Sequence, residues 1–103
     1  MGQKIQIASV RVVGDIASYT TDRNVSSQDG ETFAGLADAE SAGTIPARLA
    51  VRLFEAVDGI VHIFAGSNHI VIRRSGGWDE AAESSASAVI ESFYSHYAAA
   101  SQA

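Results

Sequence analysis

The segment that most constrains the fold is residues 53–78, LFEAVDGIVHIFAGSNHIVIRRSGGW. Two short runs rich in β-branched residues, 60–65 and 70–74, are separated by four residues of turn-forming type, which predicts a β-hairpin. Gly59 is a natural helix stop before the hairpin, because glycine adopts a left-handed conformation at little cost. A glycine pair ends the second run, and Trp78 follows. The segment therefore predicts the order helix, strand, strand, helix.

Helices are predicted on both sides of this hairpin. Thr44 can cap a helix whose first turn tolerates Pro46, and apolar residues then recur every three or four positions up to Val57. After the hairpin, acidic residues suit the positive end of a second helix. The apolar side of that helix is formed by Trp78, Ala82, Val89, Ile90, Phe93 and Tyr94. Its alanine-rich end, residues 98–103, is predicted to fray.

A second hairpin is predicted over residues 4–21, where β-branched residues are dense and Gly14 marks a turn. The apolar positions change parity between Ile7 and Val10, which would place them on opposite faces of a regular strand. Either a bulge near Ser9 resets the phase, or both faces of the strand are partly covered. The sequence therefore does not decide which side chains of the N-terminal hairpin point toward the core.

Residues 22–43 are predicted to form a long loop, because turn-forming residues are dense there and periodicity is poor. A loop of this length is unusual in a compact domain, so a short strand at 32–33 or a turn of helix at 36–39 would interrupt it. The 103 residues suit one domain. The predicted fold class is α+β, a single domain of order ββαββα, with a mainly antiparallel sheet and two helices on one face. Phe54 and Phe64 are expected in its core.

Composition excludes several classes of function. The net charge of −5 argues against nucleic-acid binding, which rests on Lys and Arg. The absence of cysteine excludes disulfides, thiolate nucleophiles and Cys-ligated metal sites in this sequence. No apolar run has the length of a membrane span or of a signal-peptide core. We therefore expect a cytoplasmic protein with no membrane or nucleic-acid partner.

No catalytic centre is visible, so we predict neither enzyme activity nor a cofactor. The sequence has no HExxH, G-x-S-x-G, P-loop or dinucleotide-binding pattern. His62 and His69 are weak candidates for metal ligands, since they could meet across the hairpin with Asp58 or Asp79 completing the site. A small metal-binding protein or a hydrolase that uses these histidines is therefore the alternative, because a catalytic triad is recognised by geometry and not by spacing.

Two surfaces are candidates for partner binding. Arg73, Arg74 and Trp78 would form a basic edge beside an aromatic ring, although Trp78 would instead be a core anchor if it folds under the sheet. The second surface is the sheet face that two helices on the opposite side leave uncovered. The runs 60–65 and 70–74 are more apolar than a half-exposed sheet needs, which indicates a partner protein or self-association as a homo-oligomer.

Residues 53–94 also resemble the N-terminal domain of iron–sulfur cluster scaffold proteins of the Nfu/NifU type. The resemblance rests on a helix ending in Leu-Phe, a glycine before the first strand, Phe and Gly near the turn, a second strand ending in a basic residue, and a Trp that opens the last helix. The matching positions are Leu53, Phe54, Val57, Gly59, Val61, Phe64, Gly66, Ile70, Val71, Ile72, Arg73 and Trp78. The start, KIQIASV, is similar to that family's opening strand, and residues 46–50 parallel its helix entry.

The sequence departs from the family in its first hairpin, where residues 9–15 stand in place of a Thr-Pro-Asn-Pro-Asn stretch and contain no proline. The cluster-binding Cys-x-x-Cys of the scaffold proteins belongs to a separate domain, so cluster ligation does not carry over to this cysteine-free sequence. The resemblance implies a non-catalytic accessory module that contacts cluster-assembly or client proteins.

Overall fold

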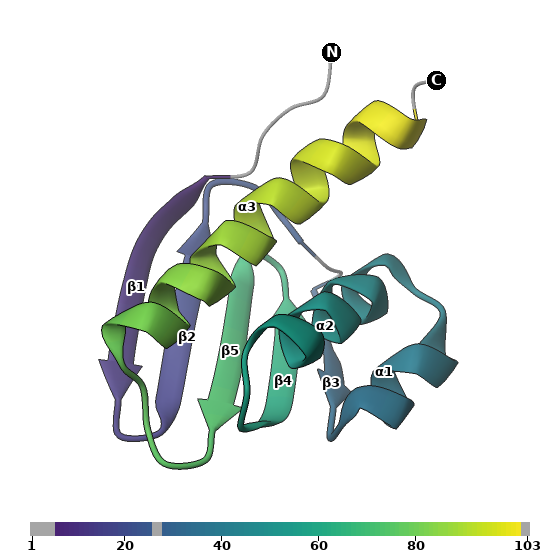
Figure 1. Ribbon diagram of the computed structural model, residues 1–103. Helices are drawn as coiled ribbons and strands as arrows, with labels where there is room; N and C mark the ends of the chain where they lie inside the picture. Colours follow the sequence, from purple (N-terminus) through teal and green to yellow (C-terminus); the bar gives the residue numbers. More distant parts are fainter. Residues whose placement is uncertain (1–5, 26–27, 102–103) are drawn as a thin grey trace.

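The computed structural model describes residues 6–25 and 28–101, with side chains described as far as Phe93. These residues form a five-stranded sheet and three helices (Figure 1). The elements in chain order are β1 (Ile7–Val13), β2 (Ile16–Thr21), β3 (Glu31–Phe33), α1 (Leu36–Ala42), α2 (Ile45–Ala56), β4 (Ile60–Gly66), β5 (His69–Arg74) and α3 (Glu80–Ser101). The predicted fold class, a single α+β domain with an antiparallel sheet, is confirmed.

The sheet joins the two predicted hairpins side by side in the order β1-β2-β5-β4-β3, and every neighbouring pair is antiparallel. The join is made by β2 and β5, whose register places Ile16 opposite Arg73 and Thr20 opposite His69. The central strand is therefore β5, which comes late in the chain.

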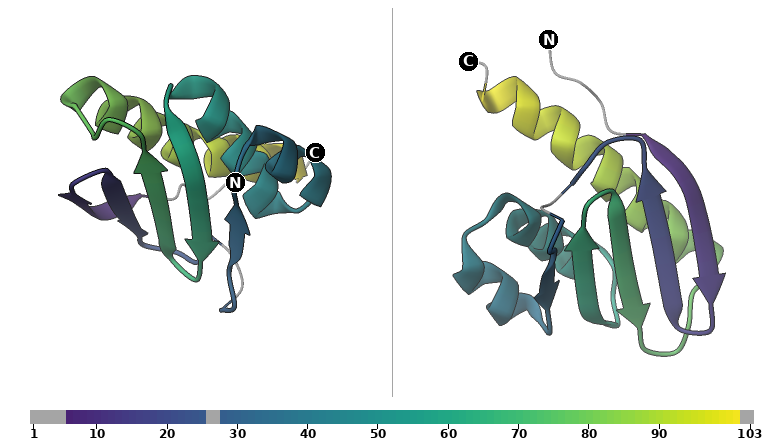
Figure 2. Two further views of the ribbon diagram at one scale, coloured as in Figure 1. Left: turned by 90° about the horizontal axis from the view of Figure 1, so that it is seen from below. Right: turned by 180° about the vertical axis from the view of Figure 1, so that it is seen from behind.

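The helices lie on one face of this sheet, and the view from behind shows the strands bare (Figures 1 and 2). α3 crosses the sheet diagonally, while α2 packs beside it and α1 packs against α2. Side chains that alternate along the strands are fully buried between the sheet and the helices. Together with side chains from α2 and α3 they form the core, whose largest fully buried members are Tyr19, Leu49, Leu53, Ile63, Ile70, Ile72, Ile90 and Thr21. Each fully buried leucine or isoleucine contributes about 1.5–3 kcal/mol through the hydrophobic effect.

A β-bulge determines which side chains of β1 point toward the helices. The register of β1 on β2 shifts between Ile7 and Ser9, so one extra residue lies in β1 at this point. Ile7 is then opposite Thr21 and Val10 opposite Tyr19, and both of these partners are buried under the helices. Of the two explanations that the sequence left open, the bulge is correct.

Residues 22–43 are not one irregular loop, because this segment contains β3 and α1. β3 is anchored by Phe33, which is buried and lies opposite Ile63 of β4. α1 buries Ala39 and ends at Gly43, whose φ of 73° is left-handed. Both elements fall where the sequence allowed a short strand and a helical turn. Their addition gives the helix layer three helices instead of the two expected.

The start of α2 follows the predicted capping. The Ala47 amide donates to the Thr44 hydroxyl at 3.2 Å, and Pro46 occupies the first turn. The helix ends at Ala56, and Gly59 with φ of 87° turns the chain into β4. This turn positions β4 for its pairing with both β3 and β5.

The expected core positions of two aromatic rings were wrong. Phe54 and Phe64 are both half-buried, and of the two only Phe54 packs against the core. Phe54 lies at the margin of the α2 stripe. Phe64 has the opposite parity to the buried Ile63 and Ala65, so its ring is on the face away from the helices.

α3 begins after Asp79, whose carboxylate accepts a hydrogen bond from the Ala82 amide at 2.7 Å. The helix continues to Ser101, although fraying was predicted from residue 98; residues 102–103 lie outside the described residues. Within the described part of the chain, no helix combines the length and the apolar character needed to cross a membrane.

Candidate functional site

The candidate site is the sheet face that the helices leave uncovered, which we call the open face. The register decides its members, because residues directly opposite one another on neighbouring strands point to the same side. Ser18, Val71 and Phe64 form its central row across β2, β5 and β4. The open face consists of Ser9, Arg11, Val13, Ile16, Ser18, Thr20, Thr32, His62, Phe64, His69, Val71 and Arg73.

The open face has an apolar centre and an apolar corner. Phe64 and Val71 are half-buried neighbours at the centre, and Val13 and Ile16 form the corner beside the β1–β2 turn with 64% and 41% of their surface exposed. Such exposed apolar groups commonly belong to binding surfaces when they are contiguous with polar side chains.

Two glycines make room for the ring of Phe64. A Cβ added at Gly66 or Gly30 would come within 2.6 or 2.7 Å of atoms of this ring, which is closer than atoms can pack. The ring therefore covers backbone that has no side chain of its own.

The charges are divided between the two sides of the molecule. Eight of the twelve carboxylate residues lie on the helices or directly beside their ends: Asp38, Glu40, Glu55, Asp58, Asp79, Glu80, Glu83 and Glu91. The open face instead carries Arg11, Arg73 and two histidines, with Asp15 as its neighbouring acid. The open face therefore carries more arginine than carboxylate, in a protein whose net charge is −5.

Arg73 is the one member of the predicted basic edge that lies on the open face. Its Nε donates to Asp15 Oδ2 at 3.0 Å, and 60% of its side chain remains exposed. An ion pair this exposed contributes between about 0 and 1 kcal/mol to stability, so Arg73 is available for a partner.

Arg74 points to the other side of the sheet, because adjacent strand residues face opposite ways. Its Nε donates to the Asp58 carbonyl and its Nη1 to the Gly77 carbonyl, both at 2.8 Å. Asp79 Oδ2 lies 3.9 Å from the same Nη1. Arg74 thereby connects the end of α2 with the loop that leads into α3.

Trp78 is a core anchor. Its Nε1 donates to the Asp15 carbonyl at 3.0 Å, and its half-buried ring meets Tyr19 edge-on with centroids 6.4 Å apart. The structure therefore does not bring Arg73, Arg74 and Trp78 together on one surface.

The two histidines proposed as metal ligands are far apart. His62 is opposite Arg73 and His69 is opposite Gly66, so four residue steps, about 13 Å, separate them along the sheet. The register thus places them at opposite ends of the hairpin, although both are on the open face. Among the described residues, no three His, Asp or Glu side chains are grouped as metal ligands.

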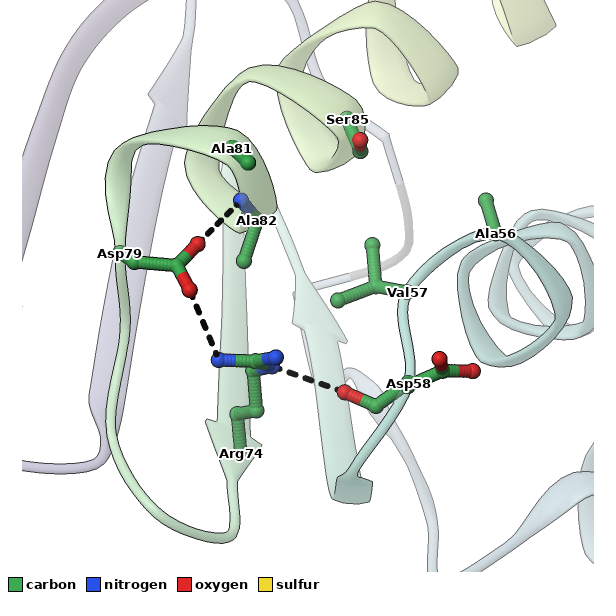
Figure 3. A pocket seen from close by; sticks show the side chains of 8 residues that line it. All are labelled: Ala56, Val57, Asp58, Arg74, Asp79, Ala81, Ala82 and Ser85. Atoms are coloured by element: carbon green, nitrogen blue, oxygen red, sulfur yellow. Dashed lines mark hydrogen bonds and ion pairs between the residues drawn. The ribbon is translucent and has the colours of Figure 1, made fainter.

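A shallow pocket lies on the helix side where α2, β5 and α3 meet (Figure 3). Its volume is about 170 Å³, and its lining consists of Ala56, Val57, Asp58, Arg74, Asp79, Ala81, Ala82 and Ser85. The carboxylate of Asp79 is engaged by the Ala82 amide and by Arg74, as the dashed lines in Figure 3 show. Arg74 and Asp79 bind one another and neighbouring backbone groups here, so the pocket is a structural junction between α2, β5 and α3.

The buried Tyr19 has a strongly shifted pKa. Its hydroxyl donates to the Glu83 carbonyl at 3.2 Å. The pKa is raised to about 12, chiefly by burial away from water; a hydrogen bond with Ser87 lowers it and the charge of Glu83 raises it. A phenol with this pKa stays protonated at neutral pH.

No protein-family model and no curated protein matches this chain. Among solved structures, the chain is similar to protein SAV1430 from Staphylococcus aureus, with a TM-score of 0.62 and 16% sequence identity. The match covers 84% of this chain and 99% of that protein. At this identity the likeness concerns the fold alone.

Proposed function

We propose that this protein is a non-catalytic interaction module that binds a partner protein on the open face. The observation that carries the proposal is the separation of charge and apolar surface. The helix layer holds most of the carboxylates, while the uncovered face of the sheet presents Arg11 and Arg73 around the apolar Val71. A partner surface with an apolar centre and acidic rim is complementary to this arrangement.

The proposed partner is a component or a client of iron–sulfur cluster assembly. Support for this class comes from the sequence resemblance to the N-terminal domain of Nfu/NifU-type scaffold proteins, in residues that form the β4–β5 hairpin and its flanking helices. In this proposal the protein provides contacts and no cluster ligands, because it has no cysteine.

Affinity capture from an extract of the native host tests the proposal with three baits. Arg73→Glu reverses one charge on the open face. Arg52→Glu makes the same change on the exposed side of α2 and is the matched control. We expect the wild-type protein and the control to capture a cluster-assembly protein, and Arg73→Glu to lose most of it, since a rim charge reversal repels an acidic partner.

The captured protein is then purified and its binding measured directly, with the unfolding temperatures of all three baits compared. Equal unfolding temperatures would attribute the loss to the surface. Recovery of no cluster-assembly protein by any bait would refute the partner class. Equal binding by all three baits would refute the open face as the site.

A further inference from the structure

The outer edge of β1 adjoins the open face and shares Arg11 with it, but it offers backbone groups instead of a sheet face. Within residues 6–25 and 28–101, β1 is the last strand of the sheet and pairs with β2 alone. The turn between them has two residues, and its Gly14 with φ of 61° fits a type II′ turn, which makes Val13 and Ile16 a hydrogen-bonded pair. Because peptide groups in such a ladder alternate in direction, Val12 and Val10 direct their N–H and C=O groups away from β2.

This edge lacks most of the features that usually protect a sheet edge, and Arg11 is the one charged residue in its regular part. Natural edges are short, carry charged residues (lysine above all) or proline, contain a bulge, or are covered. Residues 9–13 contain neither lysine nor proline, and Val10 and Val12 are 39% and 38% exposed. The bulge lies before this stretch, so five residues form a regular edge. At the opposite side of the sheet, β3 has three residues and lies beside α1 and α2.

The side chains along this edge specify what would bind there. Val10 and Val12 point to the helix-covered side, and Arg11 between them points to the open face. No hydrogen bond or ion pair of the Arg11 side chain is formed within the described residues. A strand added here would place apolar residues beside the two valines and would gain most from an acidic residue opposite Arg11.

A second copy of the chain is a poorer match than such a segment. Antiparallel pairing of residues 9–13 with themselves, which uses the whole regular edge, would place Arg11 directly opposite its own copy. A pairing centred on Val10 would avoid that repulsion but would extend into the bulge. Each copy also carries a net charge of −5.

We propose that the β1 edge binds an extended segment of a partner protein with the pattern apolar–acidic–apolar, which adds a sixth strand to the sheet with its acidic residue opposite Arg11. Binding of this kind combines main-chain hydrogen bonds with selection by alternate side chains. The inference rests on the edge and not on the open-face contact proposed above.

Two blocked pentapeptides test the proposal, Thr-Val-Glu-Val-Thr and Thr-Val-Lys-Val-Thr. Each is titrated into the ¹⁵N-labelled protein, and amide shifts are followed by NMR. We expect the glutamate peptide to shift the amides of Val10 and Val12 and to bind roughly fivefold more tightly than the lysine peptide, the upper range for one cross-strand charge pair. Arg11→Glu should reverse this preference.

A proline variant tests the strand geometry separately. Val12→Pro removes an outward N–H, which an added strand needs, but leaves the bonds between β1 and β2 intact. We expect Val12→Pro to abolish peptide binding while the remaining amide signals keep the positions of the folded protein. Val12→Thr, which keeps the N–H, should bind the peptide as the wild type does. Arg73→Glu should keep the peptide preference, so failure of the edge and failure of the open face are distinguishable.

Three results would overturn the proposal. The first is equal binding of the two peptides, or no binding of either at millimolar concentration. The second is a set of shifts that falls on β4 and β5 instead of β1. The third is concentration-dependent sedimentation of the wild-type protein that Val12→Pro abolishes, which would assign the edge to a second copy.

Discussion

Tyr19 connects strand β2 with Trp78 and with helix α3. Its ring packs edge-on against Trp78, and its hydroxyl donates to the Glu83 carbonyl of α3. The residue is fully buried and lies opposite Ile70 of β5. A charged phenolate at this position would have to be desolvated, which is why the pKa is raised to about 12.

The Tyr19 pKa predicts a specific loss of stability at alkaline pH. In the unfolded chain the phenol titrates near its ordinary pKa of 10.0, so above this pH unfolding releases a proton and becomes more favourable. Tyr19→Phe should lower the free energy of unfolding by about 0.5–1.5 kcal/mol at pH 7, through the lost hydrogen bond. Between pH 10 and 12 the variant should then lose less stability than the wild type.

Denaturant unfolding followed by far-UV circular dichroism, in steps from pH 7 to pH 12, measures this difference. If the free energy of unfolding changed with pH in the same way for both proteins over the whole range, the Tyr19 pKa would be the same in the folded and the unfolded chain.

Strand parity could have decided the roles of the two arginines from the sequence. Arg73 and Arg74 are adjacent in a predicted strand, so they face opposite sides and cannot share a patch. Which side would be open depended on the helix positions, and the sequence favoured Trp78 as a core anchor over a surface residue without showing what it contacts. The hydrogen bond from its indole to the Asp15 carbonyl joins residues 63 positions apart, and no local pattern predicts such a contact.

At the scale of elements, Arg74 of β5 links the end of α2 to the loop that precedes α3. It connects carbonyl groups of Asp58 and Gly77, and 22% of its side chain is exposed. Hydrogen bonds from a charged group at a partly buried position are among the stronger ones in proteins.

Arg74→Ala should therefore lower the free energy of unfolding by about 1.5–3 kcal/mol, since it leaves carbonyl groups without their charged donor. Arg73→Ala, the adjacent control on the open face, should cost less than about 1 kcal/mol because its ion pair is exposed. Urea unfolding of both variants measures the comparison. A larger loss of unfolding free energy for Arg73→Ala would mean that the ion pair on the open face contributes more to stability than the hydrogen bonds of Arg74.

The elements that the sequence predicted well are those with long apolar periodicity or a strong stop signal. α2 has its Thr44 cap and buried stripe, and the β4–β5 hairpin has its central turn. β3 and α1 each bury a single residue, Phe33 and Ala39, so no periodic pattern could form. These two elements are held by tertiary contacts with β4 and α2.

At the scale of the whole molecule, the order of the strands decides the candidate site. Hydrophobic patterns predicted two hairpins but not that β2 pairs with β5. That pairing brings Arg73 beside Ile16 and makes one continuous open face out of two separate hairpins. The same register separates His62 from His69, so the metal site considered from the sequence has no geometric basis.

The strand order also predicts a gradient of amide hydrogen exchange. β5 is hydrogen-bonded on both sides, whereas β1 has one edge that no other described strand pairs with. We expect the amides of Ile70 and Ile72 to exchange more slowly than those of Val10 and Val12 by a factor of roughly 100 or more, which corresponds to about 2.7 kcal/mol of protection. Native-state exchange measured by NMR in dilute solution provides the test. Equal protection of β1 and β5 would indicate that the β1 edge is already covered.

The pairing of β2 with β5 also sets the timing of folding on the ribosome. The N-terminal hairpin is synthesised first, yet Ile16 has no β5 neighbour until Arg73 has been added. At about 5–20 residues per second, the intervening 57 residues take on the order of 3–11 s to translate. Throughout that interval α3, which covers Tyr19 in the folded protein, has not yet been synthesised. Chaperone dependence during translation should therefore be concentrated in the segment of the chain that emerges earliest.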